Sequence, residues 1–291
     1  MHRRAFLLSA ATLPLLRAGA WAQSGGAVNV LYAGSLVNLM EHGIGPAFDK
    51  TGDGVFQGFA QGSNALANQI KGRLRHGDVF ISATPNVNNE LMGEANGNWV
   101  SWYATFAQSP LVIGYNPSSR FAEALKTKAW YEVMQEPGMR IGRTDPKLDP
   151  KGRLTVELFD KASLLYNLAD LSRKVLGEAE NPAQVSPEET LVGRLQSGQL
   201  DVGFFYATET SELKIPAIAL PPETALGAHY TVTVLNNAAN AAGAARFVSF
   251  LLGPQGAQIL HQHGLELVKP SVSGDVSQAP ASLRSVIEEA K

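Results

Sequence analysis

The sequence contains no cysteine among its 291 residues, which excludes disulfide bonds and metal sites built on thiolates. It also lacks the G-x-S-x-G nucleophile elbow, the P-loop and the zinc-binding H-E-x-x-H pattern. Repeats and low-complexity tracts are absent. Beyond residue 22, no apolar run approaches the roughly 20 residues that cross a bilayer. With 45% hydrophobic and only 17% charged residues, the composition predicts a soluble protein that folds around an ordinary apolar core.

The first 22 residues have the pattern of a secretory signal peptide. Residues 2–4 are basic, residues 5–16 form an apolar run too short to span a membrane, and residues 20–22 form a small-x-small cleavage site. The paired arginines also fit a twin-arginine signal, so both export routes stay open. Cleavage after residue 22 would remove three arginines and no acid, which changes the net charge from −2 to −5. An acidic exported protein is a poor candidate for nucleic-acid binding.

Short apolar runs alternate with helical patterns along the rest of the chain, which predicts an α/β fold with largely parallel sheets. The length favours two domains or lobes. We expect strands at residues 28–33, 56–59, 79–83, 99–115, 139–143, 200–206, 215–220 and 230–235. We expect helices after Ser35 and at residues 65–70, 120–135, 156–168, 186–195, 241–252 and 257–263, with the remainder as a tail.

Three strands within the first part of the chain are followed by a serine. Ser35 and Ser63 stand where helix N-caps are expected, and Ser82 ends the next strand. Each serine alone is most simply a structural cap. In a parallel sheet, however, the carboxyl ends of the strands lie together, and ligands bind there. The first N–H groups of a helix favour anions. The three junctions together therefore predict a polar pocket.

The second half of the chain adds further candidates for this pocket. The loop at residues 142–155 contains two Asp-Pro pairs, Asp145-Pro146 and Asp149-Pro150, and is either a rigid ligand-binding turn or an ordinary surface loop. Ser186 is expected at the N-cap of a helix, with Pro187 at its first position. Tyr206 ends a strand, either with its hydroxyl available to a ligand or as a half-buried packing residue.

The chemistry of these candidates favours binding over catalysis. Asp145 and Asp149 are spaced to serve as an acid–base pair, so an exported hydrolase remains an alternative. No nucleophile or oriented base accompanies them. The available groups are instead neutral donors, namely hydroxyls and backbone N–H groups at helix starts, which suit a small desolvated oxyanion. We expect no catalytic residue and no cofactor.

Six segments, taken in order, resemble the periplasmic molybdate/tungstate-binding proteins that serve ABC importers. These segments span residues 32–36, 62–70, 78–83, 142–154, 198–206 and 247–264. The resemblance implies a two-lobe periplasmic-binding-protein type II fold, with hinge strands between the lobes and the oxyanion in the cleft. We expect lobe 1 to comprise residues 27–108 and 229–291, and lobe 2 to comprise residues 109–228.

The resemblance also assigns ligand contacts. It implies that Ser35 and Ser63 supply hydroxyl and backbone donors from lobe 1 and that Ser82 lies nearby. From lobe 2 it implies a backbone donor near Lys151 in the turn that ends at Gly152, another at Thr190, and the phenol of Tyr206. The expected binding residues are Ser35, Ser63, Ser82, Asp149, Lys151, Gly152, Thr190 and Tyr206.

The loop before Gly152 is most similar to a tungstate-selective branch, some members of which add two carboxylates to the metal. Asp149 matches the first carboxylate. The second would fall near Phe205, where this chain has none unless Glu209 substitutes. We therefore favour a four-coordinate oxyanion held by hydrogen bonds, with Asp149 pointing away or capping its loop. Lys151 and Arg153 are interpreted as rim charges that steer the anion.

These implications together predict a monomeric solute-binding protein of the periplasm. It captures molybdate or tungstate by closure of the lobes and delivers the ion to a membrane ABC permease. Alternatives are the same fold tuned to sulfate or a small organic acid, or the exported hydrolase.

Overall fold

The computed structural model describes residues 25–288, and the predicted signal peptide lies outside them. Its strands are β1 Ala27–Ala33, β2 Val55–Gln61, β3 Val79–Ser82, β4 Trp102–Tyr115, β5 Ile141–Gly142, β6 Val202–Tyr206, β7 Ala217–Ala219, β8 Gly227–Val234 and β9 Glu266–Gly274. The main path of strand pairing is β2-β1-β3-β8-β4-β6-β5, and β7 and β9 both pair with β4.

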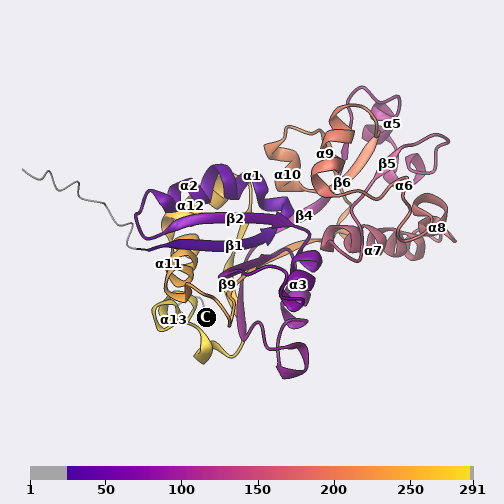
Figure 1. Cartoon of the computed structure of the whole chain (residues 1–291). Coiled ribbons are helices and arrows are strands. Elements are labelled where there is room, and N and C mark those ends of the chain that lie inside the picture. Colours follow the sequence, from indigo (N-terminus) through magenta and orange to yellow (C-terminus); the bar gives the residue numbers. More distant parts are fainter. Residues whose placement is uncertain (1–24, 289–291) are drawn as a thin grey trace, which may run out of the picture.

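The helices cover this sheet in two groups (Figure 1). They are α1 Val37–Leu39, α2 Gly45–Asp49, α3 Ser63–Lys71, α4 Pro85–Asn89, α5 Ala122–Thr127, α6 Trp130–Val133, α7 Pro150–Leu165, α8 Leu171–Leu176, α9 Glu188–Gln196, α10 Ala207–Glu212, α11 Ala241–Leu252, α12 Pro254–Gln262 and α13 Ala281–Glu288. Among residues 25–288, no helix is long and apolar enough to cross a membrane.

Lobe 1 is built around β1, which is buried on both of its faces. Val28 and Val30 belong to the larger core cluster, which also contains Phe48 of α2 and Phe247 of α11. Leu31, on the opposite face, packs in a second cluster that includes Leu66 of α3. Because both faces are covered, the strand reads as a continuous apolar run. This arrangement places the carboxyl ends of β1, β2 and β3 at one edge of the sheet.

Lobe 2 is built around β6 in the same way. Phe204 packs edge-to-face on Phe159 of α7, with ring centroids 5.7 Å apart. Phe205 points to the other face, into a cluster with Leu191 and Leu195 of α9. The two helices therefore lie on opposite faces of β6, and their N-termini lie toward the carboxyl end of that strand.

The 14-residue strand β4 joins the two lobes. Its first half pairs antiparallel with β8 and β9, and its second half, from Leu111, pairs with β6 and β7. We propose that this exchange of partners marks the predicted boundary at residues 108–109, and that the start of β8 marks the return near residue 228. Figure 1 shows the two groups of helices on either side of this crossing.

The sheet is less parallel than the sequence led us to expect. Among the described strands, only β1 with β2, β1 with β3 and β5 with β6 pair parallel, whereas five pairings are antiparallel. The long β4 lies where a strand was expected, at residues 99–115, but it runs antiparallel to each of its partners, which the sequence did not indicate. The expected C-terminal tail was also wrong, since β9 pairs with β4 and α13 buries Leu283 and Ile287 in the main core.

Several helix boundaries also differ from the prediction. Helix α7 begins at Pro150 instead of residue 156, because Asp149 caps it and Pro150 fits its first position. The helix expected at residues 120–135 is two short helices, α5 and α6, separated by two extended residues, Lys128 and Ala129. Neither Ser35 nor Ser63 is an N-cap: the caps are Ala33 and Gly62. Both serines instead lie within the first helical turn.

Candidate functional site

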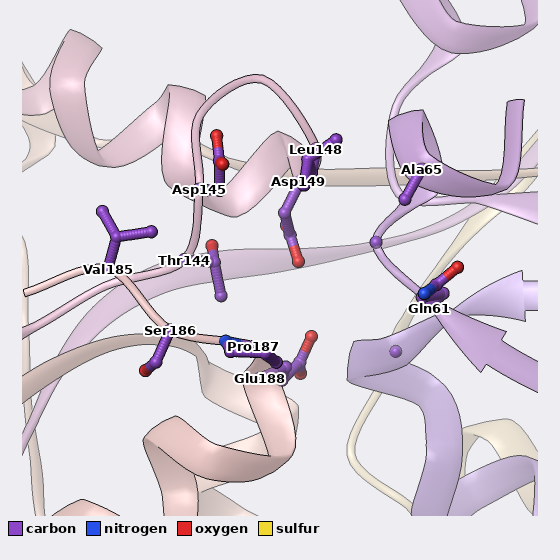
Figure 2. Close-up of a pocket in the computed structure, with 12 residues that line it drawn as sticks. Gln61, Ala65, Thr144, Asp145, Leu148, Asp149, Val185, Ser186, Pro187 and Glu188 are labelled. Carbon is purple, nitrogen blue, oxygen red and sulfur yellow. The ribbon is translucent and has the colours of Figure 1, made fainter. Parts of the chain in front are cut away.

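A cleft of about 240 Å³ lies between the two lobes. Lobe 1 contributes the ends of β1 and β2 and the start of α3, and lobe 2 contributes two loops. Figure 2 shows Asp149 and Glu188 pointing into the same space from these two loops, opposite Gln61 of lobe 1. The lining residues are Gly34, Gln61, Gly62, Ala65, Thr144, Asp145, Leu148, Asp149, Val185, Ser186, Pro187 and Glu188.

The lobes touch directly at one edge of this cleft. The backbone N–H of Ala65 donates to the carbonyl of Leu148 at 3.0 Å. Ala65 is the third residue of α3, so its N–H has no partner within the helix, and the opposite lobe satisfies it. Gly62 permits this approach, because a Cβ there would lie 2.4 Å from the Leu148 carbonyl oxygen. The N-terminus of α3 is thus part of an interface between the lobes.

Buried Arg143 positions the second loop of lobe 2. Its guanidinium donates to the carbonyls of Glu178 and Ala179 at 2.9 Å, and its own carbonyl accepts the N–H of Ser186. These contacts align residues 184–186 beside the end of β5. Ser186 therefore belongs to an extended segment, which corrects its predicted role: the N-cap of α9 is Pro187, and the helix begins at Glu188.

The two aspartates of the Asp-Pro loop stabilise local turns. Asp149 Oδ1 accepts the backbone N–H of Lys151 at 2.8 Å and caps α7, and Asp145 Oδ1 accepts the N–H of Lys147 at 2.7 Å. The expected capping role of Asp149 is confirmed, although its carboxylate also lines the cleft. These roles as backbone acceptors explain both Asp-Pro pairs without an acid–base function.

Lys151 lies in a buried ionic cluster, so its predicted position at the rim is wrong. Its side chain is only 1% exposed. Its Nζ lies 2.8 and 3.0 Å from the two carboxylate oxygens of Glu209 and 3.0 Å from Glu188 Oε1. Lys151 lies in the first turn of α7, and its side chain points into the protein. A buried ammonium needs carboxylate partners, and Glu188 and Glu209 supply them. Arg153, two residues further along α7, is half-exposed and lies near Glu157.

Opposing effects set the charges of this cluster. Burial alone would lower the pKa of Lys151, but Glu188, Glu209 and Asp149 outweigh it and raise that pKa. Burial alone would raise the pKa of Glu188, but Lys151 lowers it. Burial and the charge of Glu188 together raise the pKa of Glu209 well above its usual range. The cluster thus contains an ammonium on Lys151 and a carboxylate on Glu188. Its third member, the carboxyl group of Glu209, holds a proton more readily than usual.

The three predicted serines lie at the carboxyl ends of β1, β2 and β3, where the sequence placed them. Ser35 shares a hydrogen bond of 2.9 Å with the Tyr230 hydroxyl. Ser63 Oγ accepts the backbone N–H of Ala83 at 3.1 Å. Ser82 Oγ donates to the carbonyl of Thr84 at 2.8 Å. None of the three lines the larger cleft, and Ser35 lines a smaller cavity beside it.

The remaining predicted residues are spread around the cleft. Tyr206 is fully buried against Tyr230 and does not line the cleft, and its hydroxyl has no hydrogen-bond partner among the described residues. Gly152 lies within α7, where a Cβ would approach the Thr144 carbonyl oxygen to 2.5 Å, so it permits the helix to pack on the loop. Thr190 is exposed in the first turn of α9. Of the eight predicted residues, only Asp149 lines the larger cleft.

Sequence reasoning missed Glu188, Thr144 and Gln61. Glu188 was recognised only as part of a helix start, because nothing local indicates that it pairs with Lys151. The hydroxyls of Thr144 and Ser186 are buried without a hydrogen-bond partner among the described residues, as is that of Tyr206. Glu209, considered as a second metal ligand, is held by Lys151 and by the backbone N–H of Tyr206 at 2.7 Å. Within residues 25–288, no cluster of three or more His, Cys, Asp or Glu residues is arranged to hold a metal ion.

The chain is similar to several proteins that are named as solute-binding or molybdate-binding proteins. The chain is 28% identical over 260 residues to an uncharacterised solute-binding protein of Petrotoga mobilis, which covers 79% of this chain and 80% of that protein. It is 24% identical over 280 residues to the molybdate/tungstate-binding protein WtpA of Thermococcus kodakarensis, covering 80% and 78%. The periplasmic molybdate-binding protein of Azotobacter vinelandii superposes with a TM-score of 0.63 at 20% identity, covering 83% of this chain and 99% of that protein.

The superposition shows the same type II periplasmic-binding fold with two lobes that the sequence predicted. A family model for bacterial extracellular solute-binding proteins matches residues 28–266, which is most of the chain. The protein therefore belongs to the bacterial extracellular solute-binding protein family.

Proposed function

We propose that this protein captures molybdate or tungstate in the cleft between its lobes and delivers the oxyanion to a membrane ABC permease. The observation that carries the proposal is the set of three buried hydroxyls, on Thr144, Ser186 and Tyr206, that have no hydrogen-bond partner among the described residues. A buried hydroxyl without a partner is costly, and a ligand oxygen would satisfy it. Two of the three belong to residues that line the cleft.

The electrostatics of the cleft support a ligand bound through neutral donors. Asp149 and Glu188 are the acidic groups nearest its centre in Figure 2. Asp149 accepts a backbone N–H at the start of α7, and Glu188 pairs with Lys151. Their charges are therefore partly compensated within the protein. The N-termini of α3, α7 and α9 all contribute residues to the cleft, and helix N-termini favour an anion.

The relatives named for molybdate and tungstate support this ligand class. We further propose that residues 1–22 direct export to the periplasm by the Sec or twin-arginine route, and that the mature protein acts there as a monomer. Its partners are then the oxyanion and the permease, with no cofactor. Sulfate or a small organic acid remains the alternative ligand.

Thermal unfolding of the purified protein with molybdate, tungstate, sulfate or phosphate tests the proposal. A ligand at 100 times its dissociation constant stabilises the folded protein by about 2.7 kcal/mol, which raises the melting temperature by several degrees. We expect this rise with molybdate and tungstate only. A rise with sulfate alone would show that the cleft is tuned to another anion, and no rise with any of the four would contradict oxyanion capture.

A further inference from the structure

Glu188 separates the cleft from a second, smaller cavity. This cavity measures about 60 Å³, and among its lining residues are Gly34, Ser35, Glu188 and Glu209. Gly34 and Glu188 also line the larger cleft. The two residues meet across the lobes, since a Cβ on Gly34 would lie 2.9 Å from Glu188 Oε2. The Glu188 carboxylate is therefore a partition between the two spaces.

Glu188 also stands between the cleft and Lys151. The ammonium of Lys151 has three N–H donors. Glu209 lies within hydrogen-bond distance through both of its oxygens, at 2.8 and 3.0 Å, and Glu188 Oε1 lies at 3.0 Å. Of these two carboxylates, Glu209 is the more deeply buried, with 4% of its side chain exposed against 12% for Glu188. Only Glu188 belongs to the lining of the larger cleft.

We propose that Glu188 is a specificity-determining residue whose carboxylate occupies the position beside Lys151 that an anionic ligand would otherwise take. This inference rests on the proposed function. The carboxylate of Glu188 neutralises Lys151 and repels any dianion that approaches Lys151. The ligand must then bind through neutral hydroxyl and amide donors, whose fixed positions discriminate by size. Without the charge of Glu188, Lys151 keeps only Glu209 as a carboxylate partner, and the side of the ammonium that Glu188 occupied attracts dianions of any shape.

Calorimetric titration of the wild-type protein and the Glu188→Gln variant with tungstate, molybdate, sulfate and phosphate tests this role. Glutamine keeps the size of the side chain and removes its charge. We expect the variant to bind each anion about tenfold more tightly or better, because like charges in close contact cost more than 1.4 kcal/mol, which is tenfold in affinity. The affinities for sulfate and phosphate rise as well, so the differences in affinity among the four anions become smaller.

Two further variants identify the source of the gain. Glu157→Gln makes the same charge change at a half-exposed side chain of α7 and is expected to leave each affinity within about twofold. Combining Lys151→Gln with Glu188→Gln removes the cation and is expected to abolish the gain. A circular-dichroism melt of each variant verifies folding.

The outcomes separate this inference from the proposed function. If the wild-type protein binds none of the anions but Glu188→Gln binds them, the inference stands and the proposed ligand is wrong. If the wild type binds molybdate and Glu188→Gln binds it equally or more weakly, Glu188 contacts the ligand or is irrelevant, and the inference is overturned. Absence of binding by both proteins also overturns it.

Discussion

At the scale of the residue, the phenol of Tyr206 provides a direct test of ligand contact. The hydroxyl is fully buried without a hydrogen-bond partner among the described residues. Burial, followed by Tyr230 and the neighbouring acidic charges, raises the pKa of Tyr206 well above its usual range, so the phenol keeps its proton and can donate. Its nearest aromatic neighbour, Tyr230, differs because its hydroxyl is already paired with Ser35.

The substitution Tyr206→Phe should therefore separate stability from binding. Removing an unpaired buried hydroxyl is expected to leave the free energy of unfolding unchanged or to raise it by up to about 1 kcal/mol. The affinity for molybdate should fall about 10- to 100-fold, because a hydrogen bond to a charged group contributes about 1.5–3 kcal/mol. Urea unfolding and calorimetric titration measure the two effects.

Tyr230→Phe is the matched control for this substitution. It breaks the pair with Ser35 and is expected to destabilise the protein by about 1 kcal/mol. If Tyr206→Phe destabilises the protein as much and leaves molybdate affinity unchanged, the phenol has a structural role only.

The place of a residue at the end of a strand was easier to predict than its burial and its partners. The sequence placed Ser35, Ser63 and Ser82 at the ends of parallel strands, as found, because strand ends follow from local patterns. The burial of Lys151 was not predictable in this way. Its partner Glu209 lies 58 positions away, and only the packing of α7 against β6 and α10 brings them together.

At the scale of the element, an ion pair between buried Asp201 and half-exposed Arg140 fixes the approaches to β5 and β6. Asp201 is 3% exposed and accepts hydrogen bonds from the side chain and backbone N–H of Arg140 and from Ser119. Burial alone would raise the pKa of Asp201, but these hydrogen bonds outweigh it and hold the pKa below its usual range. Because the pKa of Asp201 is lower in the folded protein than in the unfolded chain, its carboxylate stabilises the fold at pH values above the unfolded-state pKa, which is about 4. This stabilisation is lost as the pH falls further.

We expect Asp201→Asn to lower the free energy of unfolding by about 2–3 kcal/mol at pH 7 and at pH 5. The difference from wild type should shrink as the pH falls below about 4, because the Asp201 carboxylate of the unfolded chain then gains a proton before that of the folded protein does. Urea unfolding at the three pH values measures it. Asp170→Asn, which breaks an exposed pair with Arg173, should cost less than about 1 kcal/mol. If the difference in unfolding free energy between wild type and Asp201→Asn stays constant down to pH 3, the lowered pKa of Asp201 does not contribute to stability.

The contact between α3 and the Asp-Pro loop yields a prediction about closure. A Cβ at Gly62 would lie 2.4 Å from the Leu148 carbonyl oxygen of the opposite lobe. Gly62→Ala should therefore hold the lobes apart and weaken molybdate binding at least about tenfold, while the unfolding free energy stays within about 1 kcal/mol. Titration calorimetry and urea unfolding test both statements.

Gly193→Ala serves as the control for this substitution. A Cβ on this helical glycine of α9 meets nothing within 4 Å. It should raise the unfolding free energy by about 0.5–1 kcal/mol without altering affinity. Equal affinities for both alanine variants would show that closure at Gly62 does not matter for binding.

Elements with strong apolar patterns were predicted well, and those without were not. Helix α11 matches the predicted bounds of residues 241–252, and β1, β2, β3 and β6 lie where expected. The missed strand β9 is mostly exposed and contains Pro270, so its sequence carries no strand signal. It exists because the first half of β4 offers an edge for pairing, which is a tertiary effect.

At the scale of the whole molecule, the two lobes and the cleft follow from one strand exchange. Strand β4 pairs with lobe 1 and then with lobe 2, so the carboxyl ends of both sets of parallel strands lie toward one cleft. The sequence predicted an α/β protein and a strand at residues 99–115 that passes between the lobes, but not which strands each half of it pairs with. The resemblance to a known family supplied the two-lobe arrangement, because the pairing of β4 depends on residues more than 100 positions apart.

Anomalous diffraction from crystals grown with tungstate tests most directly whether a tetrahedral oxyanion binds in this cleft. We expect one strong tungsten peak between the N-terminus of α3 and the loop at Asp149, with oxygen atoms of the ion within hydrogen-bond distance of Tyr206, Thr144 or Ser186. A peak elsewhere, or no peak at a tungstate concentration well above the dissociation constant from titration calorimetry, would contradict binding in this cleft.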